Sequence, residues 1–107
     1  VRDDQSLVVE TRRGLLVVLG CSHAGIVNTL TYIQEWTGRT DFHTVIGGTH
    51  LGAVSEAQLV KTMEALRQFD IQRIGVSHCT GFRPAAELAR SFGERFFLCN
   101  VGTEVEI

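Results

Sequence analysis

Three histidines of this sequence end the same four-residue pattern, in which a glycine, one variable residue and a serine or threonine precede the histidine. They are His23, His50 and His78, and a glycine follows each of them within three residues. Imidazole is a common ligand of zinc, iron or manganese, and a neighbouring hydroxyl can hold its second nitrogen. Glycines let the backbone turn sharply and approach a ligand closely. The repetition therefore predicts a metal site that these histidines share.

A single histidine near a strand end more often makes an ordinary hydrogen bond in a loop. His43 lies outside the repeated pattern and is interpreted in that way, as a structural residue. Cys21 is expected at the tip of a strand and is a candidate metal ligand or reactive thiol. Cys79 is a weaker candidate, because it directly follows His78 and neighbours in an extended segment point apart.

Other residues capable of chemistry carry weaker signals. Cys99 lies in an apolar segment and is expected to be inert core. Asp3 and Asp4 could supply a carboxylate ligand, but acidic residues near a terminus are usually solvated. The glycine-rich turns could hold a phosphate on exposed amides, although no Walker or GxGxxG spacing accompanies them.

Alternating strands and helices are expected to position these residues. Short runs rich in β-branched residues predict strands, and apolar residues at helical spacing predict helices. We predict strands over 7–10, 15–19, 43–46, 72–76, 95–99 and 104–107. Helices are predicted between them over 24–36, behind a capping box at 55–58, and from Pro84 as a first helical position.

This order predicts an α/β fold, namely a mixed sheet with crossover helices, in a single domain over residues 1–107. Crossovers place the carboxyl ends of successive parallel strands at one edge of the sheet. Ligands of such sheets bind outside this edge. Each motif histidine follows a predicted strand, so we expect the three to converge on one patch.

The composition limits the function classes. The 107 residues are 44% hydrophobic and 21% charged, with a formal net charge of −2, which indicates a globular domain without a basic face for nucleic acid. Three cysteines without a regular framework favour a reducing, cytoplasmic environment. Neither a signal peptide nor an apolar run of membrane-spanning length is expected. Because the sequence begins at Val1 without a methionine, we expect it to be part of a longer protein.

Two segments resemble a known family. Residues 14–28 (GLLVVLGCSHAGIVN) and 75–81 (GVSHCTG) together resemble the metallo-β-lactamase-fold hydrolases, in the branch named for a dihydropterin ribofuranosylaminobenzene phosphate synthase of methanopterin biosynthesis. Residues 3–11, 45–51 and 101–105 fit the same branch. The family fold is an αββα sandwich of two similar halves with metals at the seam between the sheets. The resemblance implies that this chain is the C-terminal half.

The resemblance also implies roles for single residues. His78 would match the family's last histidine ligand, and the preceding ligand would be His23 or Cys21, the latter at the place where many relatives carry a bridging aspartate. The family's principal metal motif, H-x-H-x-D-H, is absent from this sequence and is expected in the N-terminal half. The residues that would contact a small-molecule substrate are His50, Thr49 and Asn28.

We therefore expect part of a metal-dependent hydrolase of an ester, phosphoester or lactone, with zinc, or alternatively manganese or iron, as its divalent metal. The isolated fragment is expected to be inactive, and to self-associate through the apolar sheet face that would meet the N-terminal half. Two alternatives are a non-catalytic metal- or redox-responsive binding module, and a thiol hydrolase in which Cys79 works with a histidine base.

Overall fold

The computed structural model describes residues 5–20, 22, 25–49, 51–52, 54–77, 80–99 and 102–105, with Phe82 described by its backbone alone. Within these residues, five strands and three helices follow one another. They are β1 (Ser6–Thr11), β2 (Gly14–Leu19), α1 (Ile26–Thr37), β3 (Asp41–Gly48), α2 (Glu56–Arg67), β4 (Asp70–Ser77), α3 (Phe82–Phe92) and β5 (Phe96–Leu98), with a 3₁₀ turn over Gly93–Arg95 before the last strand.

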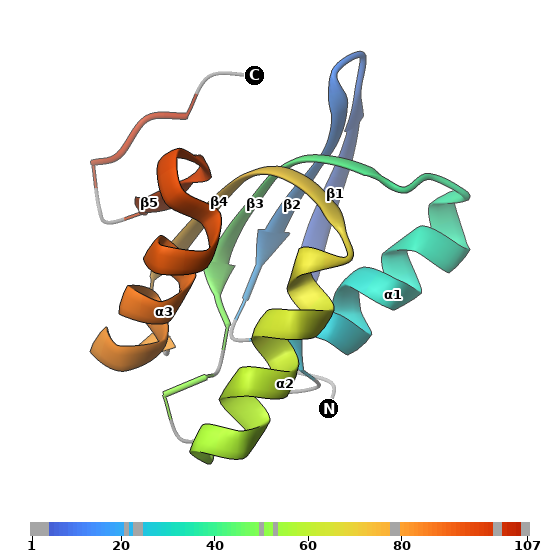
Figure 1. The fold of residues 1–107 in the computed structure, drawn as a ribbon. Helices are drawn as coiled ribbons and strands as arrows, with labels where there is room; N and C mark the ends of the chain where they lie inside the picture. The colour runs from blue at the N-terminus through green and yellow to red at the C-terminus, as the bar shows by residue number, and fades with distance from the viewer. Residues whose placement is uncertain are drawn as a thin grey trace.

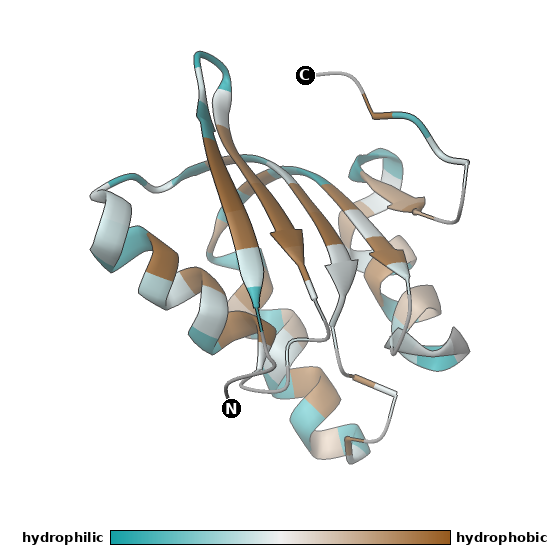
Figure 2. Ribbon diagram, turned by 180° about the vertical axis from the view of Figure 1, so that it is seen from behind, coloured by the Kyte–Doolittle hydropathy of each residue, from teal (hydrophilic) through white to brown (hydrophobic). Residues whose placement is uncertain are grey.

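The strands form one sheet in the order β1-β2-β3-β4-β5. β1 and β2 are an antiparallel hairpin, and each later strand joins its neighbour in parallel. The predicted mixed sheet with crossover helices is thus confirmed. The three helices lie on the same side of the sheet (Figure 1), and the view from behind shows the strands in front of them (Figure 2).

The core fills the space between the helices and one face of the sheet. Every second residue of β2 points into it, namely Leu15, Val17 and Leu19, as the two-residue period of a strand requires. The helices contribute apolar stripes at helical spacing. These stripes are Ile26, Leu30 and Ile33 of α1, Leu59, Met63 and Leu66 of α2, and Leu88 and Phe92 of α3. Burial of each such side chain stabilises the fold by about 1.5–3 kcal/mol.

The opposite face of the sheet carries apolar side chains that no described helix covers. Leu7 pairs with Val18 and Val18 with Ile46, while Val9 pairs with Leu16. Leu7 and Val9 are 60% and 40% exposed, and the other three residues are half-buried. Hydrophobic residues along the strands are visible from this side in Figure 2. We call this surface of β1, β2 and β3 the open sheet face.

The structure differs from the predictions in several places. α1 begins at Ile26, after Gly25, whose φ of 94° is outside the helical range. Pro84 is the third residue of α3. Its missing N–H costs nothing there, because the N–H groups of the first helical turn have no acceptor within the helix. The strand predicted over 104–107 is not formed at Glu104 and Val105, and its last two residues lie outside the described part. Cys99 is half-buried rather than core, since it follows the last residue of the edge strand β5.

The predicted N-cap at Ser55 is confirmed, because its hydroxyl accepts a hydrogen bond from the Gln58 amide at 3.2 Å. Among the described residues, no helix is both long enough and apolar enough to cross a membrane.

Candidate functional site

The carboxyl ends of β2, β3 and β4 lie side by side at one edge of the sheet. Leu19 pairs with Gly47, and Gly48 pairs with Ser77, so the three strands end in register. Each strand end leads directly into one copy of the glycine–hydroxyl–histidine motif. The expected convergence of these strand ends is therefore present in the structure.

Of the residues predicted to form the site, Thr49 and Asn28 belong to the described part of the chain. The predicted metal ligands Cys21, His23 and His78 lie outside the described residues, as does His50. The weaker candidates Asp3, Asp4 and Cys79 also lie outside them. Their roles stay predictions, and the described residues beside them define the frame of the site.

Ser22 ties the end of β2 to the end of β3. Its hydroxyl, on a side chain that is 1% exposed, donates a 2.7 Å hydrogen bond to the Gly48 carbonyl. The Gly48 amide donates to the Gly20 carbonyl at 3.0 Å, and the Gly25 amide donates to the Ser22 carbonyl at 2.9 Å. Ser22 has a φ of 62°, which is uncommon for a residue with a side chain. Gly20 and Ser22 are thus both hydrogen-bonded to the end of β3, and Ser22 has an unusual backbone conformation.

Thr49 and Thr80 tie the end of β3 to the turn after β4. The Thr49 hydroxyl donates to the Thr80 hydroxyl at 2.8 Å, and the Thr49 amide donates to the same oxygen at 3.3 Å. The Thr80 hydroxyl in turn donates to the Ser77 carbonyl at 3.0 Å. Neither threonine is more than 2% exposed. The two turns also touch, since a Cβ added to Gly81 would lie 3.3 Å from the Cα of Gly52.

These links give the hydroxyl position of the repeated motif a structural role. Ser22 and Thr49 occupy that position, and both turn inward to join neighbouring strand ends. Neither Ser22 nor Thr80 was among the residues predicted for the site. For Ser22 a signal was present in the recurrence of a serine or threonine before each histidine, whereas Thr80 follows His78 and lies outside that pattern.

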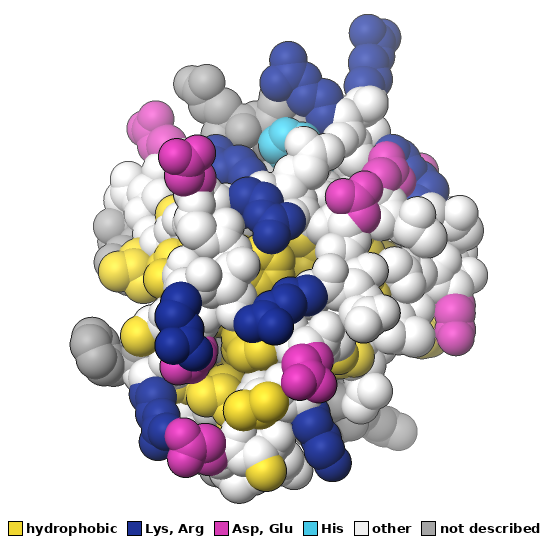
Figure 3. Space-filling view, viewed as in Figure 1, with side chains coloured by type: hydrophobic (Ala, Val, Ile, Leu, Met, Phe, Trp, Pro, Cys, Tyr) yellow, Lys and Arg dark blue, Asp and Glu magenta, His cyan; other side chains and the backbone are white. Residues whose placement is uncertain are grey.

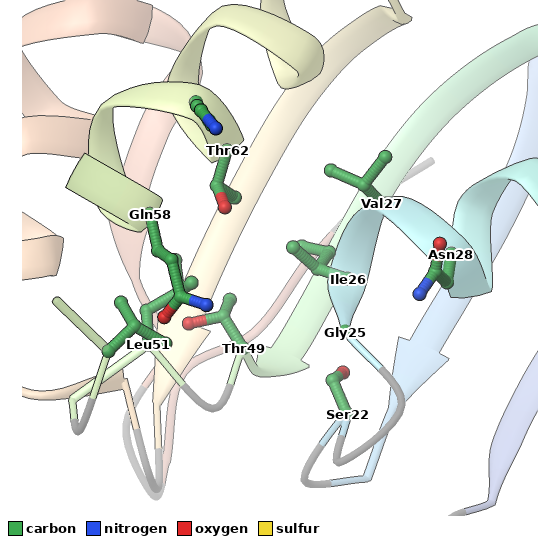
Figure 4. A pocket seen from close by; sticks show the side chains of 11 residues that line it. Ser22, Gly25, Ile26, Val27, Asn28, Thr49, Leu51, Gln58 and Thr62 are labelled. Carbon is green, nitrogen blue, oxygen red and sulfur yellow. The ribbon is translucent and has the colours of Figure 1, made fainter.

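A pocket of about 340 Å³ opens beside these strand ends, between the start of α1 and the first half of α2 (Figure 4). Thr49 and Asn28, the two described substrate candidates, both line it. Three lining residues of α2 were not predicted, although their spacing places them on one side of the helix. They are Gln58, Lys61 and Thr62.

The described residues hold no cluster of three or more histidine, cysteine or acidic side chains suited to a metal ion. The donors predicted beside the frame are imidazole nitrogens and a thiolate, the set that zinc prefers. Ser22 and Ser77 directly precede His23 and His78 in the chain. Hydrogen bonds to Gly48 and from Thr80 hold these two serines at this edge of the sheet. The frame therefore fits a metal site at this edge of the sheet.

At the N-terminal end of β3, an ion pair and a hydrogen bond connect the strand to the β1–β2 hairpin. Arg39 pairs with Asp41 at 2.6 Å and donates to the Thr11 carbonyl of the hairpin at 3.3 Å. The hydrogen bond from Arg39 holds the pKa of Asp41 below its ordinary value and raises the pKa of Arg39. His43, on the same strand, is buried with its Nδ1 2.7 Å from the Thr44 hydroxyl oxygen.

Comparison with known proteins gives relatives that are longer than this chain. The chain is 34% identical to the 7,8-dihydropterin-6-methyl-4-(β-D-ribofuranosyl)-aminobenzene-5′-phosphate synthase of Methanocaldococcus jannaschii. The alignment spans 102 residues, which are 95% of this chain and 35% of the synthase. An uncharacterized protein of the same organism is 33% identical over 90 residues, 84% of this chain and 32% of that protein. No family model matches the chain.

A solved structure of a metal-dependent hydrolase of the β-lactamase superfamily has the same fold, with a TM-score of 0.88 and 36% identity over 96% of this chain and 40% of the hydrolase. The chain spans about a third of the length of the curated relatives it matches and 40% of the solved hydrolase, which agrees with the expectation that it is half of a domain. In sequence and in fold, the chain is thus similar to part of a metal-dependent hydrolase of the β-lactamase superfamily and to part of the synthase.

Proposed function

We propose that this chain forms one wall of the active site of a metal-dependent hydrolase. The observation that carries the proposal is the frame at the strand ends, where Ser22 bonds to Gly48 and Thr49 bonds to Thr80. These bonds lock three neighbouring strand ends whose next residues include the motif histidines. The fold shared with a solved metal-dependent hydrolase supports the same function.

In this proposal His78 and His23, with or without Cys21, are the ligands that this chain supplies to a divalent metal. Zinc suits these donors best, with manganese or iron as alternatives. A bound metal of this kind polarises the scissile group of the substrate and lowers the pKa of a bound water to about 7. The residues of this chain orient the ligands, through the Ser22 and Thr80 bonds, and contact the substrate, through His50, Thr49 and Asn28.

The proposed substrate is a small molecule with an ester, phosphoester or lactone bond. The pocket lined by Thr49 and Asn28 is large enough for part of such a molecule. The name of the synthase relative includes a 5′-phosphate group, which supports a substrate that carries a phosphate.

The second wall of the site is proposed to come from the other half of the same fold, which would carry the H-x-H-x-D-H motif. The chain covers only 40% of the solved hydrolase, and its open sheet face exposes apolar side chains such as Leu7 and Val9. A second sheet packed on this face would bury them, as in a two-layer sheet sandwich.

Metal uptake by the intact protein tests the proposed ligands. We expect His78→Ala to lower the stoichiometry or the affinity for zinc, measured by competition with a chromogenic chelator. His43→Gln is the matched control, because it also removes an imidazole but from a site near the far end of β3. Equal uptake by the wild type and His78→Ala would refute the assignment.

Activity separates the hydrolase from its alternatives. Tight metal binding without hydrolysis of phosphodiesters or lactones would favour a binding module. Hydrolysis that resists chelators but is lost on alkylation of Cys79 would favour a thiol hydrolase.

A further inference from the structure

Lys61 is the single lysine of the sequence, and it lines the pocket beside the strand ends. Among the described residues that line this pocket, none is an aspartate or glutamate. Arg39, Arg83 and Arg90, by contrast, each pair with a carboxylate, whereas Lys61 forms no ion pair with any side chain in the described part of the chain. No described residue of this pocket therefore neutralises the positive charge of Lys61.

The hollow between α2 and α3 provides an internal comparison. It has a volume of about 220 Å³ and is lined by three arginines and three glutamates. There Arg83 pairs with Glu56 and Arg90 with Glu87, and basic and acidic side chains alternate over this helix-covered face (Figure 3). Among the described residues, the hollow between α2 and α3 is thus balanced in charge, whereas the Lys61 pocket carries one unpaired positive charge.

The other polar groups of the pocket indicate where an anion would sit. The hydroxyl protons of Ser22 and Thr49 are already donated to Gly48 and Thr80. Toward the pocket these two oxygens can only accept hydrogen bonds, so neither hydroxyl is available to donate a hydrogen bond to an anion. On α2, the side chains of Gln58 and Thr62 line the pocket (Figure 4) and can donate hydrogen bonds, and these residues lie three positions before and one position after Lys61.

We propose that this pocket binds an anionic group, a phosphate or carboxylate, with Lys61 of α2 as the residue that selects for it. A lysine ammonium is a compact, mobile charge that is well suited to contacting a phosphate at the mouth of a pocket. Because the pocket reaches the strand ends, the anionic group would belong to the substrate of the proposed hydrolase. This last step rests on the proposed function, but the binding of the anion does not.

The direct test measures binding of inorganic phosphate to the intact, metal-free protein by calorimetry or by NMR shift titration. Removal of the metal prevents phosphate from binding to it instead. We expect Lys61→Gln to weaken phosphate binding about tenfold, as for the loss of one charged hydrogen bond, and Lys61→Arg to retain most of it. Arg12→Gln is the control, since it removes the same charge from the exposed hairpin turn.

Phosphate binding that is the same in the wild type and Lys61→Gln would overturn the inference. Acetate serves as the second probe, and tighter binding of acetate than of phosphate would identify a carboxylate as the ligand group. Both affinities should fall with added salt, because the lysine is exposed to solvent.

Kinetics distinguish a failure of this inference from a failure of the proposed function. For paired substrates with and without an anionic group, Lys61→Gln should raise KM for the anionic substrate and leave kcat and the neutral substrate unchanged. If the protein binds phosphate through Lys61 but has no hydrolase activity, the inferred anion site stands and the proposed hydrolase function is refuted. Active hydrolysis with no effect of Lys61→Gln on either substrate would refute the pocket alone.

Discussion

The hydroxyl oxygens of Thr49 and Thr80 lie 2.8 Å apart and connect the end of β3 to the turn between β4 and α3. The Thr80 proton is committed to the Ser77 carbonyl, so the Thr49 proton must point to Thr80. One buried oxygen atom thus organises two of the three strand ends beside which the site is proposed. Any change at Thr80 should affect both the stability of the fold and the arrangement of the site.

Thr80→Val tests this link, because valine keeps the shape of threonine and removes the hydroxyl. The change leaves the Ser77 carbonyl and the amide and hydroxyl of Thr49 without their partner, which should cost about 1–3 kcal/mol in the free energy of unfolding. Urea denaturation measures the cost. Thr31→Val is the control, since it removes an exposed hydroxyl that bonds within α1, and it should change stability by less than about 0.5 kcal/mol. Equal stability of the two variants would contradict the role of Thr80.

Ser22 offers a test of the turn at the end of β2. Ser22→Ala and Ser22→Gly both lose the hydrogen bond to the Gly48 carbonyl, but only glycine adopts a φ of 62° without strain. Ser22→Ala should therefore be the less stable variant in thermal unfolding, by about 1 kcal/mol. If the alanine variant unfolds at the same temperature as the glycine variant or above it, the left-handed conformation at Ser22 is not strained.

Local patterns were enough to predict most of the framework. The hairpin, the stripe of Leu59, Met63 and Leu66, and the cap at Ser55 are each determined within a few residues of the chain. The convergence of the strand ends followed from the alternation of strands and helices. These features need no knowledge of distant contacts.

The remainder depends on contacts between distant segments. Thr80 meets Thr49 across 31 positions of the sequence, and Lys61 shares a pocket with Ser22 only because α2 packs beside the start of α1. Similarly, the alternating residues at 104 and 105 have the pattern of a strand but pair with no described strand. Pattern alone cannot supply a pairing partner.

The Phe97 ring occupies the space that a side chain at Gly75 would need, on the side of the sheet away from the helices. A Cβ at this position would lie 2.4 Å from the Phe97 ring, which also stacks under the Arg73 guanidinium at 4.7 Å. Gly75→Ala should lower the free energy of unfolding by about 1–3 kcal/mol through overpacking. In the Phe97→Leu background the same change should cost less, and a double-mutant cycle measures the difference. Strictly additive effects would show that the ring does not limit this position.

The Arg39–Asp41 pair predicts an acid-sensitive step in stability. Because Arg39 lowers the pKa of Asp41 in the folded chain, the pair stabilises the fold above the unfolded pKa of about 3.9. This contribution is lost as the pH falls through the lower, folded pKa. Asp41→Asn should therefore lower the melting temperature at pH 6 and have a smaller effect at pH 2. A difference between wild type and variant that is the same at both pH values would contradict this role.

The open sheet face should make residues 1–107 self-associate when they are produced alone. Leu7 and Val9 are exposed on the edge strand β1, which has neither the lysine nor the proline that commonly protects such an edge. Sedimentation velocity should detect dimers or larger species, and Leu7→Lys with Val9→Lys should return the chain to a monomer. Tyr32→Lys with Trp36→Lys is the matched control, because these residues are even more exposed but lie on α1. If that pair of changes abolished association and the β1 pair did not, the contact would involve α1, and the open sheet face would not be the surface that a second half covers.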